Sequence, residues 1–220
     1  MLASELISNS IPPLKTSDTV QKSLERMTEF KLYHLPIVNE TQFLGLLAEE
    51  ELIEIKDVTQ AIGSLPLSLL NPFVYEDAHI YDIIRLFHQL RLSIVPVLDY
   101  KKNYLGLISI NNLLEYTAEI YAVKEYGGII VLEIGNRNNS LAHMAQIVEA
   151  DNAQVLSSYV RSFPDSTKLE VTLKINKTDL SGIISSFERY NYQVKAVFNT
   201  TTSDNGTEDR FNSFMNFLNV

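Results

Sequence analysis

The sequence predicts an α/β fold with two parts: a unit of about 60 residues that occurs twice, followed by a βαββαβ domain. Residues 1–60 and 61–125 repeat the same order of apolar stripes, prolines and glycines. A repeat of this length indicates a duplicated small domain rather than a solenoid. Gly127-Gly128 then interrupts the pattern, and residues 127–199 follow a different order of strands and helices.

Composition and charge exclude several functions. The chain has 220 residues, 45% of them hydrophobic, and a formal net charge of −9. This acidic balance argues against binding of nucleic acid or anionic membranes, which requires clustered Lys and Arg. No cysteine is present, so a disulfide frame, a thiolate nucleophile and a Cys-ligated zinc are excluded. No apolar run approaches the roughly 18 residues of a membrane helix, and the first residues lack the pattern of a signal peptide, so we expect a cytoplasmic protein.

Each repeat starts with an amphipathic helix. In the first repeat, Val20, Leu24 and Met27 lie at i, i+4 and i+7 and form one apolar stripe. Ser17 or Asp18 is placed to cap the start of this helix. The equivalent stripe and cap of the second repeat are Ile80, Ile84, Phe87 and Asp77.

Two short strands follow each helix. The first contains a proline, Pro36 in one repeat and Pro96 in the other, and proline in a strand belongs at an edge or a bulge. We therefore expect two equivalent edges that face each other. The second strand contains a glycine, Gly45 or Gly106, and leads into another helix. The segments that match position by position are 34–38 with 94–98 and 43–52 with 104–113.

These residues resemble the tandem pair of cystathionine-β-synthase (CBS) domains, also called a Bateman module. The motifs that carry the resemblance are LPIVN…LGLLAEEEL and VPVLD…LGLISINNL, and it covers about residues 1–124. In that family, the two units pack by their sheets and leave two clefts between them. The resemblance implies a regulatory ligand in these clefts, namely AMP, ADP, ATP or S-adenosylmethionine. It also implies that a hydroxyl binds the phosphate, an Asp binds the ribose, and groups beside the proline strand hold the adenine.

The polar positions of this motif differ from the family pattern. The first repeat has Ala48 in place of the hydroxyl and Glu51 in place of the Asp. The second repeat keeps the hydroxyl as Ser109 but has Asn112 at the Asp position, which offers one good acceptor oxygen. The resemblance assigns the ribose to Glu51 or Asn112 and the phosphate to Ser109. Further cleft residues expected beside the proline strands are His34, Pro36, Arg91 and Pro96, with Lys31 as another cation.

A purely structural explanation of the same residues stays open. Gly45 and Gly106 then only permit close packing of a strand against a helix. Glu51 and Asn112 then only start a helix, where acidic and polar side chains suit the helix dipole.

Residues 127–199 contain four predicted strands and two predicted helices. Within residues 168–175, apolar and polar residues alternate, which is typical of a strand with one buried face. The other predicted elements are strands at 129–134, 154–163 and 193–198 and helices capped by Ser140 and by Thr178 or Asp179. The resulting order, βαββαβ, is the ferredoxin-like arrangement.

This order and size resemble the ACT domain, a regulatory module for small ligands. The resemblance implies an amino acid bound at the turn between the first strand and the first helix, across a dimer. The turn residues here are Arg137, Asn138, Asn139 and Leu141. Asparagine tolerates left-handed backbone, and Arg137 is suited to hold a carboxylate. The alternative is a dimerisation domain whose sheet edges pair between chains. A CBS pair followed by an ACT-like domain resembles proteins of the acetoin-utilisation AcuB type.

The last residues predict a separate helix. Residues 200–208 are polar and turn-rich, which predicts a linker. In residues 209–220, an apolar stripe at i, i+3, i+4 and i+7 predicts an amphipathic helix, and its members are Phe211, Phe214, Met215 and Leu218. A helix this short is not stable alone, so it must dock on its own domain, the CBS pair, a second chain or a partner. We favour its own chain or a dimer.

No residues converge on catalytic chemistry. None of the four histidines has metal-ligand spacing to another, and they are His34, His79, His88 and His143. Phosphate-loop, dinucleotide and nucleophile-elbow motifs are absent. The sequence therefore predicts a regulatory module rather than an enzyme, a homodimer that senses a small ligand and acts on a protein target. The alternative is a ligand-free scaffold for dimerisation or protein interaction.

Overall fold

The computed structural model describes residues 1–135, 140–164 and 166–199. The chain divides into two compact units, Met1–Thr117 and the part from Ala118 onward, and each is treated separately below. Within these described ranges, no helix is long and apolar enough to cross a membrane. The predicted linker and C-terminal helix, 200–220, lie outside the described residues, as do Arg137, Asn138 and Asn139 of the predicted turn.

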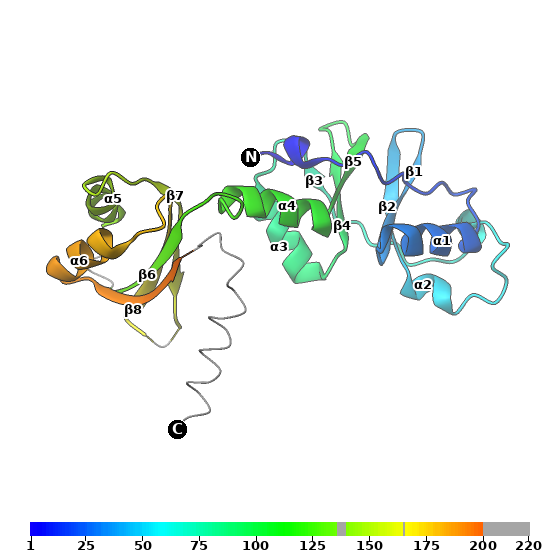
Figure 1. The fold of residues 1–220 in the computed structure, drawn as a ribbon. Helices are drawn as coiled ribbons and strands as arrows, with labels where there is room; N and C mark the ends of the chain where they lie inside the picture. Colours follow the sequence, from blue (N-terminus) through cyan, green and yellow to red (C-terminus); the bar gives the residue numbers. More distant parts are fainter. Residues whose placement is uncertain (136–139, 165, 200–220) are drawn as a thin grey trace, which may run out of the picture. The chain divides into compact units, whose positions relative to one another are not determined.

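The first unit contains the order helix, strand, strand, helix twice, and the second copy has one additional short strand (Figure 1). Copy one consists of α1 (Val20–Phe30), β1 (His34–Asn39), β2 (Gln42–Ala48) and α2 (Glu50–Ile53). Copy two consists of β3 (Val74–Tyr75), α3 (Ile80–Leu90), β4 (Ile94–Leu98), β5 (Tyr104–Ser109) and α4 (Ile110–Ile120). Two short 3-10 helices, η1 (Ala3–Leu6) and η2 (Ile62–Ser64), lie in the segments that precede the copies. We call these segments the leaders: residues 1–14 lead into copy one and residues 54–73 into copy two.

The two proline strands are not equivalent edges, so that expectation is wrong. β1 pairs antiparallel with β2 in one sheet, whereas β4 lies between β3 and β5 in the other. Pro96 is tolerated in the central strand because β3 pairs only with the two residues after it, Val97 and Leu98. The strand pairing shifts register just after each proline, at Ile37/Val38 and at Val97/Leu98, which agrees with the preference of proline for bulges.

The helix caps differ from the predicted ones by one or two residues. Thr19 caps α1, and its hydroxyl accepts a hydrogen bond from the Lys22 backbone N–H at 3.2 Å. His79 caps α3 through Nδ1, which accepts from the Tyr81 N–H at 3.3 Å. The prediction of Ser17 or Asp18 for α1 and of Asp77 for α3 is therefore wrong. These carboxylates have other donors: the Lys15 N–H and Lys22 ammonium for Asp18, and the Tyr100 hydroxyl for Asp77.

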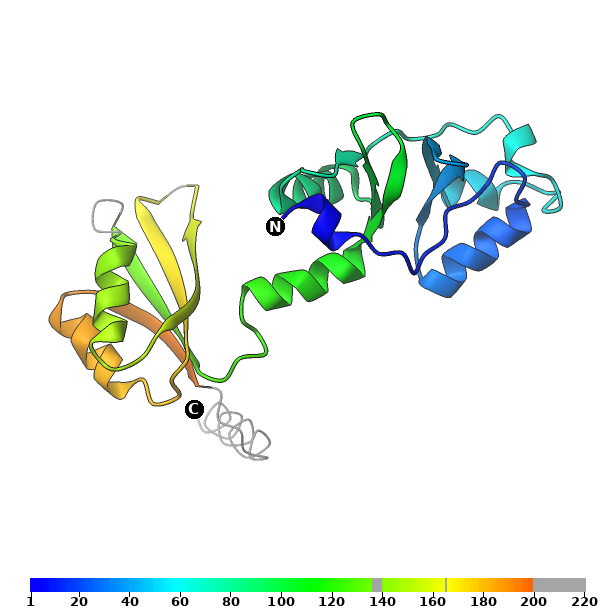
Figure 2. The ribbon, with the colours of Figure 1, turned by 90° about the horizontal axis from the view of Figure 1, so that it is seen from above.

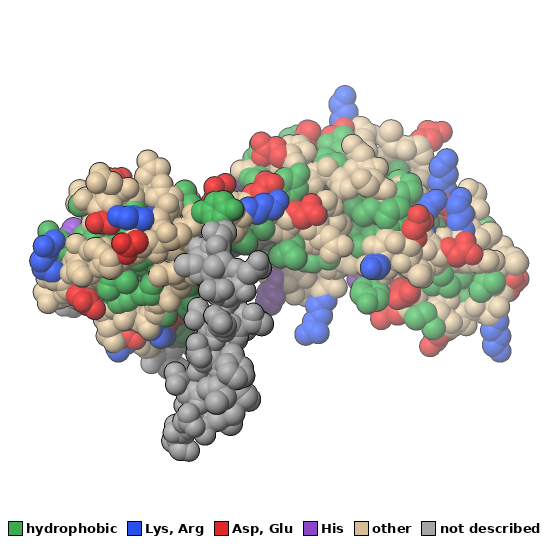
Figure 3. Space-filling view, viewed as in Figure 1, with side chains coloured by type: hydrophobic (Ala, Val, Ile, Leu, Met, Phe, Trp, Pro, Cys, Tyr) green, Lys and Arg blue, Asp and Glu red, His purple; other side chains and the backbone are tan. Residues whose placement is uncertain are grey.

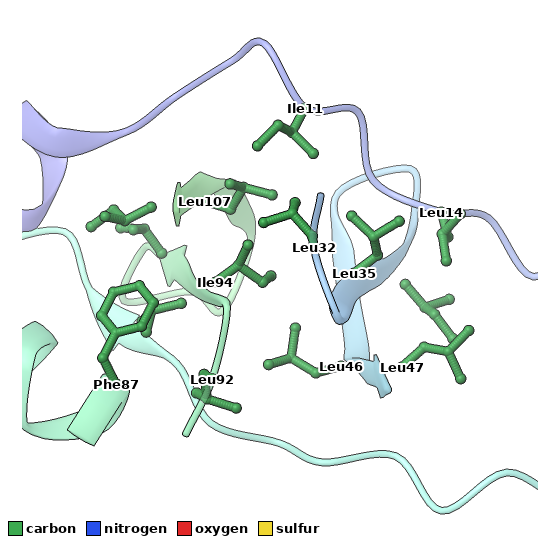
Figure 4. Close-up of a cluster of buried hydrophobic side chains, with 14 of the residues drawn as sticks. Ile11, Leu14, Leu32, Leu35, Leu46, Leu47, Phe87, Leu92, Ile94 and Leu107 are labelled. Atoms are coloured by element: carbon green, nitrogen blue, oxygen red, sulfur yellow. The ribbon is translucent and has the colours of Figure 1, made fainter. Parts of the chain in front are cut away.

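Apolar side chains from both copies form one continuous core (Figure 4). Leu35 and Leu46 come from the sheet of copy one, and Ile94 and Leu107 come from the sheet of copy two. All four are fully buried. Because neither small sheet can bury its apolar face alone, the two copies fold as one unit.

Each leader crosses the sheet of the other copy. The Ser8 N–H donates to the Leu107 carbonyl at 2.8 Å, and the Leu46 N–H donates to the Leu70 carbonyl at 2.7 Å. The strand glycines lie at these crossings. A Cβ at Gly45 would lie 2.8 Å from the Leu69 Cβ, and a Cβ at Gly106 would lie 2.4 Å from the Ile7 Cγ2. The glycines therefore allow a leader to approach the strand closely. The purely structural explanation had expected a helix at this place instead.

The second unit is a ferredoxin-like βαββαβ domain, as predicted. Its elements are β6 (Gly128–Gly135), α5 (Leu141–Glu149), β7 (Val155–Ser162), β8 (Lys168–Ile175), α6 (Ser181–Arg189) and β9 (Gln193–Asn199). The strands pair antiparallel in the order β7-β8-β6-β9. Ser140 caps α5 as predicted, accepting from the His143 N–H at 3.2 Å. Both helices cover the same face of the sheet (Figure 2), and their buried residues, which include Met144 and Phe187, form the core of this unit.

Candidate functional site

The candidate ligand site of copy two is the corner where β5 meets α4, which we call the Ser109 corner (residues 109–112). The buried Ser109 hydroxyl accepts from the Asn112 N–H at 3.2 Å and donates to the Asn112 Oδ1 at 2.5 Å. The two predicted site residues are therefore brought together, and they bond to each other. This arrangement starts an 11-residue helix, whose first N–H groups carry partial positive charge.

The equivalent corner of copy one is less polar. Ala48 ends β2 and is buried, so no hydroxyl stands at this position. The helix that follows, α2, has only four residues. Glu51 lies in it, and its carboxylate accepts from the Ser68 N–H of the leader of copy two at 3.2 Å. Glu51 thus holds the chain between the copies, a role that its local sequence did not indicate.

His34 connects the two copies through Ser93. The Ser93 hydroxyl accepts from the backbone N–H of Tyr33 at 3.1 Å and from that of His34 at 3.0 Å. In return, the Ser93 N–H donates to the His34 Nδ1 at 3.3 Å. Burial lowers the pKa of the His34 imidazole, an effect that the Glu50 carboxylate opposes. Ser93 was not predicted as a site residue. The signal for it in the sequence is its place directly before the second proline strand, where the first repeat has Tyr33.

The hairpins of the two copies also meet at their ends. The Tyr104 N–H donates to the Thr41 carbonyl at 2.7 Å, and the Thr41 hydroxyl donates to the Asn103 Oδ1 at 3.4 Å. Gln42 and Asn103 form an antiparallel bridge at the same place. Together with the leaders and the His34–Ser93 contact, these bonds hold the corners of the two copies in a defined arrangement.

Lys31 and Arg91 lie at equivalent helix ends. Both follow the last residue of a helix and have left-handed backbone, with φ of 54° and 51°. Among the described residues, neither side chain takes part in an ion pair. Pro36 and Pro96 lie inside their strands, opposite Leu46 and Leu107. Lys31 and Arg91 thus each lie three residues before their proline strand begins, at His34 and Ile94.

The second unit contains cavities as well. One has a volume of about 910 Å³ and opens where β6 ends and α5 begins, beside Ser140. Its lining includes His143, whose Nδ1 lies 2.8 Å from the Tyr192 hydroxyl, and the ion pair of Lys168 with Glu133. Leu141, the one predicted turn residue that the structure describes, is the first residue of α5 and is exposed.

His, Asp and Glu residues are spread over both units in the described ranges. Within them, no group of three or more His, Asp or Glu residues is placed to hold a metal ion. On the face drawn in Figure 3, acidic and basic side chains of the described residues are interspersed and no basic patch forms.

Comparison with known proteins finds similarity in the duplicated part of the chain. Residues 3–57 and residues 68–119 each match the family model of the CBS domain. Similar solved structures include a CBS domain pair/ACT domain protein from Thermotoga maritima, with 24% identity, 54% of this chain and 98% of that chain covered, and a TM-score of 0.49. Another is CBSX2 in complex with AMP, with 18% identity, 54% and 97% coverage, and a TM-score of 0.47. A third is the CBS domain of a bacterial CNNM/CorC family Mg²⁺ transporter in complex with ATP, with 14% identity, 52% and 85% coverage, and a TM-score of 0.43.

Proposed function

We propose that the tandem pair of CBS domains, residues 3–57 and 68–119, is a non-enzymatic regulatory module that senses an adenosine nucleotide at the Ser109 corner. The observation that supports this most is the pairing of Ser109 with Asn112 at the start of α4. The corner offers a hydroxyl, a side-chain amide and the N–H groups of a helix start, which together suit a phosphate and a ribose. The nucleotide-bound CBS proteins described above support the ligand class.

The chemistry favours copy two over copy one. A nucleotide replaces the hydrogen bond from Ser109 to Asn112: the hydroxyl then donates to a phosphate oxygen, and the freed Asn112 amide bonds a ribose hydroxyl. The exchange is favourable because one internal hydrogen bond is replaced by several hydrogen bonds to a charged ligand. In copy one, Ala48 cannot donate, and Glu51 already accepts from the Ser68 N–H.

Regulation follows from differential affinity. A ligand that binds one arrangement of the two copies more tightly shifts the population toward that arrangement. The His34–Ser93 contact and the joined hairpins are the bonds that such a shift alters within the pair. We propose that a homodimer transmits this change to a protein target.

Thermal unfolding of the full chain with AMP, ADP, ATP or S-adenosylmethionine tests the proposal. A ligand at 100 times its dissociation constant stabilises the folded state by about 2.7 kcal/mol. We expect an adenine compound to raise the melting temperature, and Ser109→Ala and Asn112→Ala to abolish the rise. Asn111→Ala is the matched control, since Asn111 is the neighbouring exposed asparagine of α4. A rise that survives Ser109→Ala and Asn112→Ala contradicts the assignment to this corner.

The cavity of the second unit supports a second candidate function, binding of an amino acid. It combines a helix start at Ser140 with Lys168 and the His143–Tyr192 pair, groups that suit a carboxylate and a small polar side chain. We expect a panel of amino acids, scored by thermal unfolding, to show stabilisation that His143→Ala removes and Ser109→Ala leaves unchanged. If no nucleotide and no amino acid stabilises the chain, both sensing proposals are wrong and the ligand-free scaffold is favoured.

A further inference from the structure

The face of the second unit's sheet that α5 and α6 leave uncovered carries an apolar groove. Seven strand residues line the groove from the sheet, and Tyr121 and Val123, from the segment before β6, line its side. The strand residues are Ile129, Val131, Ser157, Tyr159, Thr172, Lys174 and Phe198. The groove encloses about 610 Å³ and is separate from the cavity beside Ser140.

Strand register shows why these side chains gather. One row of cross-strand neighbours runs across the whole sheet and consists of Phe198, Ile129, Lys174 and Ser157. The next row consists of Ala196, Val131, Thr172 and Tyr159. Neighbours in a row project from the same face. The adjacent positions, such as Ile130 and Leu173, point to the opposite face and are buried under the helices.

The groove leaves large apolar side chains in contact with solvent. Phe198 is 58% exposed, and Tyr121, Val123 and Tyr159 are exposed as well. Tyr121 and Tyr159 meet edge to face with ring centroids 5.5 Å apart, and the Ser157 hydroxyl donates to the Tyr121 carbonyl at 3.0 Å. The side wall of the groove is therefore fixed by specific contacts, and the exposed area is a concave surface rather than scattered residues.

We propose that residues 209–220 of the same chain dock in this groove as an amphipathic helix. Their apolar stripe can cover the exposed apolar side chains of the groove. It consists of Phe211, Phe214, Met215 and Leu218. A helix of 12 residues is about 18 Å long, and four strands span about 14 Å between the axes of the outer two, so the lengths match.

The point where the described chain ends favours this occupant over a separate molecule. β9 ends at Asn199, which is the residue after Phe198 and pairs with Gly128 at the end of the sheet where the groove lies. The linker 200–208 has nine residues, and a flexible chain of that length spans about 15–18 Å on average. A segment tethered this closely has an effective concentration in the millimolar range. A separate molecule at a lower concentration therefore competes for the groove only if it binds much more tightly.

Charge supports the same docking. Lys174 lines the groove, is only 8% exposed, and donates to the Gly127 carbonyl at 3.3 Å. In the part of the chain that the structure describes, it forms no ion pair. Glu208 and Asp209 lie three and two residues before Phe211, with Arg210 between Asp209 and the stripe. A helix lying in the groove therefore brings two carboxylates toward a buried ammonium group that has no ion-pair partner among the described residues.

Disulfide trapping tests the proposal, because the chain has no cysteine of its own. Thr172→Cys in the groove is combined in turn with Phe211→Cys, Met215→Cys and Leu218→Cys. We expect at least one pair to form an intramolecular disulfide at low protein concentration, since bonding requires Cα atoms about 4.4–6.8 Å apart. Ser185→Cys, an exposed position on α6 on the opposite side of the sheet, is the matched control and should bond at least tenfold more slowly.

A second measurement reports on the native side chains. Phe214→Asp should lower the melting temperature of the second unit by about 4–8 °C, because it places a charge in the apolar stripe that docks. Asn216→Asp adds the same charge outside the apolar stripe and should leave the melting temperature unchanged. Disulfide-linked dimers would show that the groove holds a second copy instead. Equal trapping at Ser185, or no trapping with any tail position, overturns the proposal.

Discussion

The two copies in the first unit share a backbone arrangement but differ in their polar side chains. In both copies a leader crosses the glycine strand, and the glycines have φ of +148° and +156°. In both, the residue after the first long helix has left-handed backbone, Lys31 in one and Arg91 in the other. Leu46 and Leu107 occupy matching core positions and are fully buried. The shared features are those that packing and backbone hydrogen bonds require.

The polar positions of the two copies have diverged. Copy one has His34 paired across its hairpin with Ala48, whereas copy two has Ile94 paired with Ser109. Each pair therefore keeps one polar member, at opposite positions. The helix that follows is four residues long in copy one and 11 in copy two. The duplicated scaffold thus keeps its backbone arrangement although the side chains at the two corners differ.

The largest effect should come from the shared core. Leu46→Ala and Leu107→Ala each remove a fully buried side chain that lies where the two copies meet. We expect each to lower the free energy of unfolding by about 2–5 kcal/mol, measured by chemical denaturation. Leu114→Ala, at a position that is 69% exposed, should change it by less than about 0.5 kcal/mol. If only one of the two core variants is destabilised, the copies are not equivalent scaffolds.

Alanine at either strand glycine should lower stability, and a second mutation should show that the two copies differ in how the loss can be rescued. Gly45→Ala and Gly106→Ala both place a side chain at a strained φ, which costs about 1–3 kcal/mol. At Gly106 the obstructing atom is the Ile7 Cγ2, whereas at Gly45 it is the Leu69 Cβ, followed by the Leu70 carbonyl. Adding Ile7→Ala should therefore partly rescue Gly106→Ala. Adding Leu69→Ala should not rescue Gly45→Ala, because the Cβ and the carbonyl remain; rescue in both backgrounds contradicts this geometry.

Substitutions at Ser109 should change stability less than those at the core or at the glycines. Ser109→Ala removes the acceptor of the Asn112 N–H at the start of α4 and should cost about 1 kcal/mol. Ser109→Thr keeps the hydroxyl and should restore most of the loss. The unfolding midpoints of these variants, measured without ligand, show whether the corner contributes structure as well as binding. A Thr variant as unstable as the Ala variant argues against a capping role for the hydroxyl.

The smallest expected effect is a dependence of the unfolding stability on pH, which comes from His34 in copy one. Burial holds the pKa of His34 below its usual value, so the folded state binds fewer protons than the unfolded state near that value. The stability from His34 is thus fully present above about pH 6.5 and is lost as the pH falls through that region toward the lowered pKa. Protonation also removes the acceptor of the Ser93 N–H. Unfolding midpoints between pH 5 and 8 should vary less in His34→Gln, while His88→Gln, at an exposed position, should keep the wild-type dependence.

The sequence determined the duplication, the element order of both units and the ferredoxin-like second unit. These features follow from apolar periodicity, which is local and repeats with the period of each element. The resemblance of the motif LGLISINNL also singled out Ser109 and Asn112, and the structure shows that these two residues bond to each other. The Ser140 cap was predictable because a serine directly precedes the apolar stripe of the helix.

Only the tertiary structure decided which distant groups meet. The contact of His34 with Ser93, the crossing of Gly106 by Ile7 and the bond from Ser68 to Glu51 each join residues far apart in the chain. No local propensity encodes such a contact, because it depends on how two sheets pack and where the leaders run. The apolar groove over β6 arises in the same way: alternation along each strand is visible in the sequence, but the register that gathers four strands into one row is set by their pairing.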